Sequence, residues 1–403
     1  MEKKQKILWL SDSPTTSTGF GTMTLNILNG LTEAGYECHC VAHNLPGQTI
    51  KPGMEFMDGT KVNFTIHGTG TQPYGRDKVM SLIQTLKPDF FGVLLDTFMI
   101  KQAGYQGLNF SPAISIFYYP SDGEPALPFS CEQLFTSGTF QVPVAMAKHG
   151  QAQVKKAHNI DAHYIPHAIK KGLFFPFNAE RKAKNFEKWS QKLGVNLASK
   201  KVIGCVARNQ GRKMLDRLIP MMKQIAAEEP DAIMLMHTDP SDAAAYFNFQ
   251  YEIQKNNLEN RFVFTGLNYI NPYTYEEVAE IYNLMDLFLM PTTGEGFGVP
   301  IIEAMATEVP CIITDYTTTK ELVVDHNAGY AIRLNDEIMG SWEVFRGICD
   351  NEDGAKKTIE LLRNDKLRKQ MGKNGREAVL KEYTWDLVIP QWVKLLESLK
   401  SRY

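Results

Sequence analysis

The chain has 403 residues, of which 43% are hydrophobic and 22% are charged, and its formal net charge is −2. This composition is typical of a globular enzyme and excludes a disordered or fibrous chain, and the length favours two domains. No apolar run reaches the roughly 18 residues that a membrane-spanning helix requires. The six cysteines, at positions 38, 40, 131, 205, 311 and 349, are scattered, which favours reduced thiols in a cytoplasmic compartment over a disulfide framework.

The chain alternates strand-like and helix-like segments. The apolar stretch at residues 7–10 is too short for a signal peptide and is expected to form the first strand. Further segments of the first half are "ECHCVAHN", "FFGVLLD", "AISIFYYP" and the strand-like "QLFTSG", with helical patterns at residues 23–35 and 79–86. The second half repeats the pattern through "KKVIGCVAR", "AIMLMHT", "RFVFTG", "LFLMP" and "PCIITD". This alternation predicts an α/β fold with two doubly wound parallel sheets.

The join between the two domains is expected near "YIPHAI", at residues 164–169. Ligands of such sheets bind beyond the carboxyl ends of the strands, so we expect the two domains to face each other across a cleft. Residues 383–399 form an amphipathic helical pattern that is expected to pack near the join.

The stretch "TTGEGFGVPIIEAMA", at residues 292–306, joins a glycine-rich turn to an apolar helix. Glycine permits positive φ and a close approach of a ligand to the backbone, and Pro300 suits a first helical turn. The unpaired amides of such a helix start favour an anion, whereas Glu295 and Glu303 would accept hydrogen bonds from hydroxyl groups. The ligand that combines an anionic end with a polyhydroxylated end is a nucleotide sugar.

Two further segments carry phosphate-binding patterns. "CVARNQGRKMLDRL" places Arg208 and Lys213 after a strand, where they are expected to clamp a diphosphate, while Arg212 is expected to be solvated. Gly19 and Gly21 lie between the first strand and a helix. They are interpreted either as a tight turn alone or as part of a binding loop in which Ser17 and Thr18 cap the helix.

The acceptor side is less defined by the sequence. In "YYPSDGEP", Asp122 and Glu124 follow a strand and are expected to face the cleft. Asp122 is the better candidate for an acceptor-side base, although turns also favour Asp for local hydrogen bonds. Asp96 is a weaker candidate of the same kind, and His167 is interpreted as a packed histidine more readily than as a catalyst. Asp239 and Asp242 are read as loop residues, and "CHC" at residues 38–40 as a buried strand and not as a metal site.

Taken together, four features resemble family 4 of the retaining glycosyltransferases: Glu295 and Glu303 around "GFG", Arg208 with Lys213, the "IPHAI" join and "TDYTTTKELVVDHNAGY". The resemblance implies the GT-B fold, in which two Rossmann-like domains face each other and the last helix crosses back. It implies an acceptor-side domain at residues 1–168 with the helix 385–403, and a nucleotide-sugar donor domain at residues 169–384.

The resemblance also implies roles for single residues. Arg208 and Lys213 would hold the donor diphosphate, Glu303 would bind the ribose hydroxyls, and Glu321 would line the donor pocket. Glu295 would contact the sugar together with the backbone amides of Phe297, Gly298 and Val299. No metal and no cofactor besides the donor sugar nucleotide is implied. The histidine common in the first domain of the family is replaced by "PSDG", and Ala168 and Lys170 replace the family's usual glycine and aspartate, so an unusual acceptor is expected.

The expected function is metal-independent retaining transfer of a sugar from a nucleotide-diphosphate sugar to a hydroxyl of a glycan or another small acceptor. Residues 148–213 carry 15 Lys or Arg residues but only 3 Asp or Glu residues, with aromatic residues among them. Polyanion-binding proteins share this pattern, so a DNA glycosyltransferase acting on hydroxymethylated pyrimidine bases, as in some bacteriophages, stays an alternative. A nucleotide-sugar epimerase of the same fold and a catalytically silent binding module also stay open.

Overall fold

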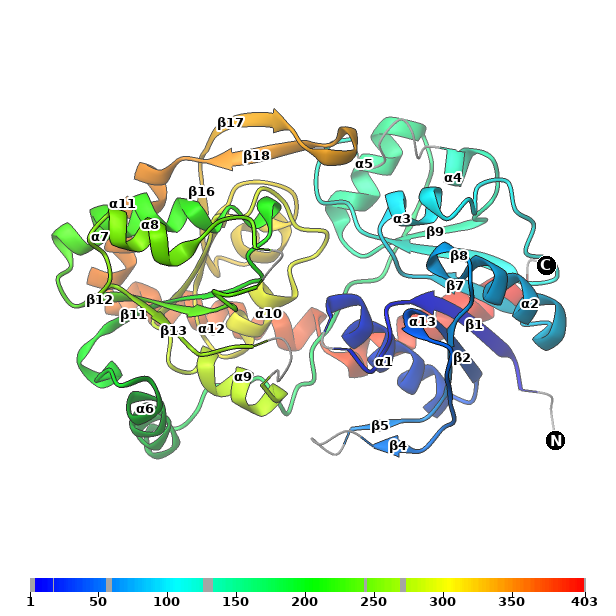
Figure 1. Ribbon diagram of the computed structural model, residues 1–403, viewed down its shortest axis with the longest axis horizontal. Coiled ribbons are helices and arrows are strands. Elements are labelled where there is room, and N and C mark those ends of the chain that lie inside the picture. The colour runs from blue at the N-terminus through cyan, green and yellow to red at the C-terminus, as the bar shows by residue number, and fades with distance from the viewer. Residues whose placement is uncertain are drawn as a thin grey trace. The chain divides into compact units, whose positions relative to one another are not determined.

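The computed structural model describes residues 4–16, 18–55, 60–125, 133–242, 245–268 and 273–401. Figure 1 shows two compact α/β units. The first contains Met1–Ala168, Gly340–Val344 and Thr384–Tyr403, and the second contains Ile169–Met339 and Phe345–Tyr383. Ser17 and Cys131 lie outside the described residues.

The first unit contains an eight-stranded sheet among the described residues, with the order β10-β9-β8-β7-β1-β2-β6-β3. All neighbours pair in parallel except β3, which runs antiparallel to β6. From the central β1 the chain first continues through β2 and β6 on one side of it and then through β7, β8, β9 and β10 on the other side. The strand order therefore reverses between β1 and β7. The strands are β1 (Lys6–Ser11), β2 (Glu37–Pro46), β3 (Thr49–Ile50), β6 (Thr65–Thr69), β7 (Phe90–Val93), β8 (Ile114–Tyr119), β9 (Val142–Ala145) and β10 (His163–Tyr164).

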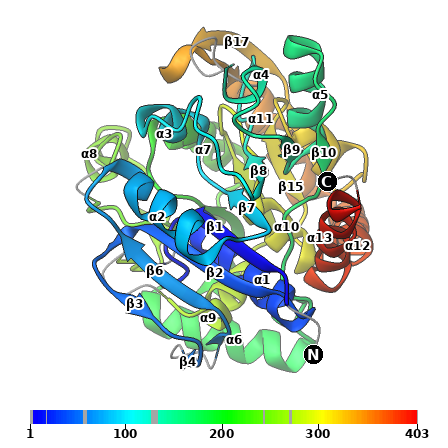
Figure 2. The same cartoon turned by 90° about the vertical axis from the view of Figure 1, so that its right-hand side faces the viewer.

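Helices cover this sheet (Figure 2). They are α1 (Gly19–Glu33), α2 (Arg76–Leu86), α3 (Thr97–Gln102), α4 (Gln133–Thr136), α5 (Lys148–His158) and α13 (Trp385–Lys400), with a 3-10 turn, η1 (Pro73–Gly75), and a small hairpin of β4 (Met54–Glu55) and β5 (Lys61–Val62). The C-terminal helix α13 packs on α1. Its fully buried Trp392 meets Trp9 and Tyr118 edge-on, with ring centroids 5.6 Å and 5.0 Å apart. The amphipathic pattern of the tail thus buries its apolar face in the first unit.

The second unit contains a six-stranded parallel sheet among the described residues, with the order β13-β12-β11-β14-β15-β16. Helices α7 and α8 lie on one side of it and α9 and α10 on the other (Figure 1). The strand order reverses between β11 and β14, the place at which doubly wound sheets bind ligands. The elements are α6 (Ala179–Leu193), β11 (Lys201–Val206), α7 (Leu218–Glu228), β12 (Ala232–His237), α8 (Phe249–Lys255), β13 (Phe262–Phe264), α9 (Tyr275–Tyr282), β14 (Leu287–Met290), α10 (Val299–Ala306), β15 (Cys311–Thr314), β16 (Gly329–Ile332), β17 (Leu334–Met339), β18 (Phe345–Cys349), α11 (Asn351–Arg363) and α12 (Asp365–Glu382).

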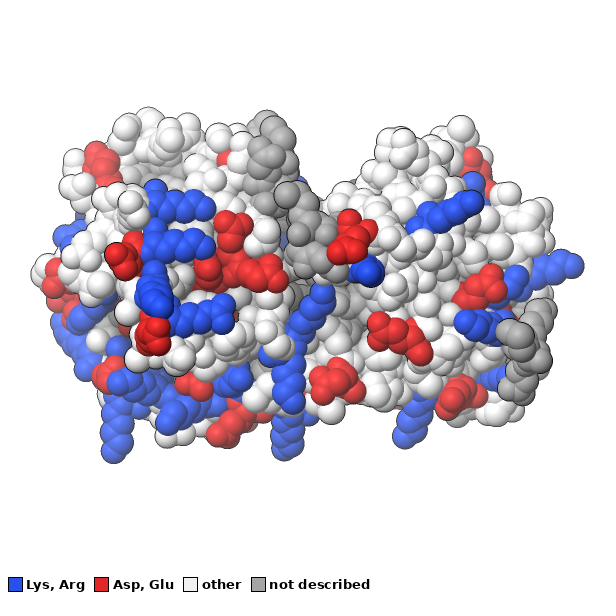
Figure 3. Space-filling model, turned by 90° about the horizontal axis from the view of Figure 1, so that it is seen from below, with Lys and Arg blue, Asp and Glu red and all other residues white. Residues whose placement is uncertain are grey.

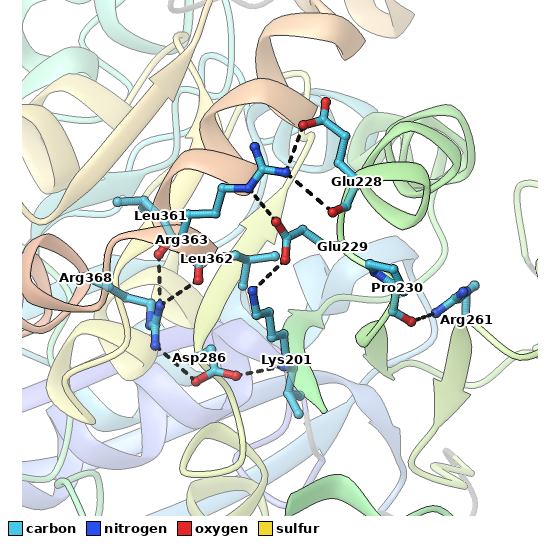
Figure 4. A network of polar contacts seen from close by, with 11 residues as sticks. Lys201, Glu228, Glu229, Pro230, Arg261, Asp286, Leu361, Leu362, Arg363 and Arg368 are labelled. Carbon is cyan, nitrogen blue, oxygen red and sulfur yellow. Dashed lines mark hydrogen bonds and ion pairs between the residues drawn. The ribbon is translucent and has the colours of Figure 1, made fainter. Parts of the chain in front are cut away.

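An ionic network ties together the amino edge of this second sheet (Figure 4). Glu229 accepts hydrogen bonds from Lys201 Nζ at 2.5 Å and from Arg363 Nε at 2.6 Å. Glu229 is only 6% exposed, and the hydrogen bond from Lys201 and the nearby Arg363 hold its pKa below the usual value although burial opposes this. The network joins the start of β11 to the ends of α7 and α11, at the edge opposite the carboxyl ends of the strands.

Some segments differ from the sequence-based expectations. The sequence predicts a strand at "QLFTSG", but Gln133–Thr136 is the short helix α4, and the strand of this region is β9. One helical turn suffices to bury Leu134 and Phe135, whereas Pro143 weakens the sequence signal of β9. Helix α1 begins at Gly19, before the expected residue 23, because the Thr18 hydroxyl accepts the Gly21 N–H and caps it.

The cysteines within the described residues, at positions 38, 40, 205, 311 and 349, are all buried and form no disulfide. Burial raises the pKa of the Cys205 thiol to about 12, so this group stays protonated at neutral pH. The cytoplasmic location that we infer from cysteine spacing stays a prediction. Among the described residues, no helix is both long and apolar enough to cross a membrane.

Candidate functional site

The candidate site lies at the carboxyl edge of the second sheet, where the strand order reverses. Arg212 and Lys213 lie in a 3-10 turn, η4 (Gly211–Lys213), that follows β11. Glu295 lies in the loop between β14 and α10. Because β11 and β14 are neighbours, residues more than 80 positions apart in the sequence meet at this edge.

Three polar side chains converge on the Glu295 carboxylate. Lys213 Nζ donates to Oε1 at 2.6 Å, and Arg212 donates to Oε2 at 3.1 Å. The Thr292 hydroxyl donates to Oε1 at 2.6 Å. Lys213 and Glu295 are only 6% and 5% exposed, so both charges of this pair are removed from water. We call Arg212, Lys213, Thr292 and Glu295 the Glu295 cluster.

The electrostatics keep this cluster ionised. Burial alone would raise the pKa of Glu295, but Lys213 and Arg212 outweigh it and lower that pKa to about 2. Burial lowers the pKa of Lys213 from its ordinary value, and the carboxylate beside it opposes that shift. Two cations around one carboxylate leave a net positive charge, which favours an anionic ligand.

Backbone hydrogen bonds fix the loops that carry the cluster. The carbonyl of Arg212 accepts from the Thr293 N–H at 2.8 Å and from the Thr293 hydroxyl at 2.9 Å. The N–H of Glu295 donates to the Thr317 hydroxyl at 3.0 Å, which attaches the loop after β15 as well. Three strand ends therefore hold one carboxylate in place, as a preorganised site requires.

The start of α10 has the backbone geometry that its glycines predict. Gly298 caps the helix with φ of 101°, and a Cβ at this position would come within 2.8 Å of the Ile301 side chain. Val299 and Pro300 form the first helical turn. Phe297 is 3% exposed, and its ring packs against that of Tyr383 with centroids 5.8 Å apart, so its side chain anchors the turn.

The two other predicted glutamates, Glu303 and Glu321, follow Glu295 in the sequence and lie in different environments. Glu303 on α10 accepts a hydrogen bond from the Tyr282 hydroxyl at 2.8 Å. Burial raises the pKa of Glu303 to about 7, despite this hydrogen bond. Glu321 is 6% exposed and lies in a π-helical turn at Lys320–Val324. Glu321 is thus buried and Glu303 is partly exposed, and the two residues lie on elements that follow β15 and β14, respectively.

The prediction that Arg208 and Lys213 together hold a diphosphate stays a prediction, and the two side chains have different partners in the structure. Arg208 contacts Asp242, with Nε 2.7 Å from Oδ2 and Nη2 3.3 Å from Oδ1. Arg212, which the sequence leaves as a solvated residue, is 35% exposed and also donates a hydrogen bond to Glu295. A spacing of five places Arg208 and Lys213 on different parts of the irregular loop after β11, and spacing alone cannot predict the course of such a loop. Thr292 and Thr317 were not predicted as members of the site, although both lie in stretches of the sequence quoted above, Thr292 in "TTGEGFG" and Thr317 in "TDYTTTK".

The predicted residues of the first unit lie at separate places. Gly21 fits the tight-turn interpretation, because a Cβ there would clash with the Ser13 carbonyl oxygen, whereas Gly19 has open space. Asp122 follows β8 in a turn, where its charge acts on His149, and neighbouring Glu124 accepts from Gln153. His167 is 3% exposed and bonds the Tyr118 hydroxyl through Nδ1 at 2.8 Å, which agrees with a packed histidine.

Comparison with solved structures shows the fold. Sucrose-phosphate synthase from Thermosynechococcus elongatus superposes with a TM-score of 0.74 at 18% identity, covering 99% of this chain and all of that one. A glycosyltransferase from Rickettsia africae gives a TM-score of 0.75 at 15% identity, with full coverage of both chains. The chain therefore has the GT-B fold of glycosyltransferases, and the predicted fold class is confirmed.

A family model matches the second half of the chain. Residues 185–378, which include the Glu295 cluster, match the family Glycosyl transferases group 1. N-acetyl-alpha-D-glucosaminyl L-malate synthase of Bacillus anthracis is 25% identical over 195 residues, which cover 48% of this chain and 44% of that protein. Mannosylfructose-phosphate synthase of Agrobacterium fabrum is 23% identical over 67% of this chain and 53% of its own length. The chain thus spans about half the length of these curated relatives.

These comparisons confirm the predicted fold, whereas the transferase activity of this chain is a proposal. The assignments to single residues stay predictions, as does metal independence. Among the described residues, no group of three or more His, Cys, Asp or Glu side chains is placed to hold a metal ion.

Proposed function

We propose that this protein is a retaining glycosyltransferase that transfers a sugar from a nucleotide-diphosphate sugar to an acceptor hydroxyl without a metal ion. The observation that carries the proposal is the buried Glu295 cluster beside the glycine-capped start of α10. A solved relative, the Anabaena protein HepE, was crystallised with UDP and glucose and has a TM-score of 0.73 at 14% identity, with 98% of this chain and all of that chain covered. The UDP and glucose in that complex support a nucleotide-sugar donor for this chain too.

The cations of the cluster suit a leaving diphosphate. When the anomeric C–O bond breaks, its electron pair goes to the diphosphate oxygen, and negative charge builds there. An ammonium group has three N–H donors, and among the described residues Lys213 donates only to Glu295. The remaining donors of Lys213 and the guanidinium of Arg212 are then held in place for phosphate oxygens. Preorganised charges of this kind stabilise the transition state without reorganisation during the reaction.

The carboxylates suit the hydroxylated parts of the donor. Glu295 stays ionised at neutral pH and would accept hydrogen bonds from sugar hydroxyls while it orients Lys213 and Arg212. Glu303 would accept from the ribose hydroxyls, and Glu321 would line the same pocket. Arg208 would contribute to diphosphate binding only by giving up or sharing Asp242, with which it is paired.

Retention of configuration requires that the acceptor attacks from the face that the diphosphate leaves. In the proposed step, a bond forms between the acceptor oxygen and the anomeric carbon as the bond to the diphosphate breaks. The hydroxyl proton goes to a diphosphate oxygen or to a protein base. Asp122 stays a candidate for that base.

The acceptor that we favour is a glycan or another small hydroxylated molecule. The DNA alternative relied on the basic stretch at residues 148–213, but acidic residues outside this stretch neutralise part of it. Lys188 contacts Glu280 at 2.6 Å, and Lys192 contacts Glu277 at 3.8 Å. Figure 3 accordingly shows Asp and Glu side chains among the Lys and Arg side chains of one face. If DNA were the acceptor, transfer would fall steeply between low and moderate salt, and a flat salt response excludes it.

Calorimetry tests the donor site before the acceptor is known. The wild-type chain and a Lys213→Ala variant are titrated with UDP, GDP, ADP and TDP, and a donor panel is then incubated with simple glycans and with hydroxymethylated DNA. We expect one nucleotide to bind the wild type and not the variant, and mass spectrometry to detect a glycosylated product. Absence of heat with all four nucleotides would contradict the proposal. Conversion of a donor to its epimer without an acceptor would favour an epimerase instead.

A further inference from the structure

One residue of the loop after β15, Thr317, has a backbone conformation that its side chain disfavours. Its φ is 50°, in the left-handed region, and of the non-glycine residues with positive φ in the described part of the chain only Thr317 is β-branched. A β-branched residue in this region is a steric outlier, whereas glycine adopts such a φ readily. Residues under this strain persist where the surrounding structure holds them, and they cluster at binding sites. We therefore expect the Thr317 side chain to have a use that glycine could not serve.

Two residues of the same loop hold Thr317 in this conformation. On one side of it, the Tyr316 hydroxyl donates to the Phe345 carbonyl of β18 at 3.0 Å. On the other side, the Thr319 hydroxyl donates to the Thr314 carbonyl at the end of β15, at 2.6 Å. These two hydrogen bonds attach the loop to both strands without using the Thr317 hydroxyl, which stays available for another contact.

The Thr317 hydroxyl is oriented by the loop that carries Glu295. It accepts a hydrogen bond from the Glu295 N–H at 3.0 Å, and Thr317 itself is half-buried. A threonine hydroxyl has one donor and two acceptor lone pairs. The described residues include no acceptor for the proton of this hydroxyl. That proton is thus left for a ligand or for water, next to the residue whose carboxylate the Glu295 cluster holds.

The place of this hydroxyl in the second sheet agrees with a ligand contact. Lys213 follows β11, Glu295 follows β14 and Thr317 follows β15, so the three residues lie at the carboxyl edge on neighbouring strands. Doubly wound sheets bind their ligands at this edge. Met214, directly after Lys213, is also in the left-handed region, with a φ of 45°. Strained residues therefore occur in two of the loops that form this edge.

We propose that Thr317 is a specificity-determining residue, whose hydroxyl donates a hydrogen bond to one hydroxyl group of the donor sugar. The inference rests on the proposed transferase function and states which feature of the sugar is recognised. A sugar hydroxyl is both a donor and an acceptor, so it can donate to the Glu295 carboxylate and accept from Thr317, whereas a phosphate oxygen only accepts. The site therefore selects a sugar that carries this hydroxyl over an analogue that lacks it, because the analogue leaves the polar groups of the site unpaired.

The test compares Thr317→Val and Thr317→Ser with wild type. Valine keeps the shape of the side chain and removes the hydroxyl, whereas serine keeps the hydroxyl. Thr319→Val is the matched control, because it removes a buried hydroxyl of the same loop that already donates to the Thr314 carbonyl. Nucleotide release is measured with UDP-glucose, UDP-N-acetylglucosamine and GDP-mannose in the presence of simple glycans and hydroxymethylated DNA. It is then measured with the monodeoxy analogues of the sugar that wild type prefers, and calorimetry gives the affinity for the free nucleotide.

We expect the recognition of one sugar hydroxyl to depend on the Thr317 hydroxyl. Wild type should prefer the parent sugar over one monodeoxy analogue by at least about tenfold in kcat/KM, since one hydrogen bond is lost. Thr317→Val should lower that preference about tenfold, because it turns over the parent sugar less efficiently, and should leave the affinity for the free nucleotide within about twofold. Thr317→Ser and Thr319→Val should both keep the wild-type preference.

Each other outcome overturns a stated point. If Thr317→Val slows the parent sugar and all its analogues by one common factor, the role of Thr317 is structural, and if it weakens binding of the free nucleotide, the contact is to phosphate. An unchanged preference in Thr317→Val, or an equal change of preference in Thr319→Val, also overturns the proposal. If Thr317→Val does not fold, Thr317→Gly carries the test with the same criteria, since it removes the hydroxyl and suits the positive φ. These outcomes leave the transferase function intact, whereas a wild type that releases nucleotide from no donor refutes that function, and the role of Thr317 falls with it.

Discussion

Removal of the Lys213 side chain should separate stability from catalysis in the Glu295 cluster. At the observed 2.6 Å, the attraction between Lys213 and Glu295 is about 6 kcal/mol for an effective dielectric constant of about 20. Much of this attraction offsets the free-energy cost of burying both charges. In Lys213→Ala, Glu295 stays buried but loses the attraction of Lys213, so its burial cost is only partly offset. Arg212 and Thr292 still bond it, so we expect a loss of about 3 kcal/mol in the free energy of unfolding, at the low end for broken buried pairs.

The loss of turnover in Lys213→Ala has a different origin from the loss of stability, and a second substitution that recovers stability should not recover turnover. Losing one preorganised donor to the leaving diphosphate should lower kcat about 100- to 1000-fold. The double variant Lys213→Ala/Glu295→Gln removes both charges, so about 2 kcal/mol of stability should return while turnover stays low. Urea unfolding and nucleotide release from the donor measure the two quantities. Equal stability of the single and double variants would refute the reasoning about the buried pair, and near-normal turnover of Lys213→Ala would refute the diphosphate assignment.

Three further variants test other parts of the second unit. Arg208→Ala should weaken nucleotide binding about tenfold, because one charged hydrogen bond is lost. It should change the free energy of unfolding by less than about 1 kcal/mol, because the ion pair of Arg208 with Asp242 is partly exposed. An unchanged nucleotide affinity in calorimetry would remove Arg208 from the site. The raised pKa of Glu303, about 7 against a usual 4.5, means that its stabilising contribution is complete below pH 4.5 and is lost as pH rises through 7. Wild type should therefore lose about 3 kcal/mol more stability than Glu303→Gln between pH 4.5 and 8, and parallel urea-unfolding profiles would contradict this. Glu229→Gln should lower the free energy of unfolding in urea by about 2 kcal/mol, because it weakens the ionic network of Figure 4. Its turnover should be unchanged, and a loss of turnover would contradict a purely structural role of this edge.

Local patterns in the sequence predicted the elements that carry the site. Alternating apolar strands and helical periods indicated the parallel sheets, because a strand buried on both faces must be apolar throughout. Glycines around Phe297 and a proline at position 300 predicted a ligand-accessible helix start, since backbone geometry at this turn depends on the residues of the turn itself. The short edge elements were missed: β17 has the sequence LNDEIM and is largely exposed, so neither burial nor alternation marks it.

What the sequence by itself determined about this protein is its class, its strand and helix pattern and the residue types of a donor site. Only the tertiary structure decided the partners, since it brings Arg212, Lys213 and Thr292 together on the Glu295 carboxylate. The reason is physical. Propensity and spacing act over a few residues, whereas the contacts of Arg212 and Lys213 with Glu295 join residues 83 and 82 positions apart. These residues lie in irregular loops whose course is set by the packing of the whole sheet.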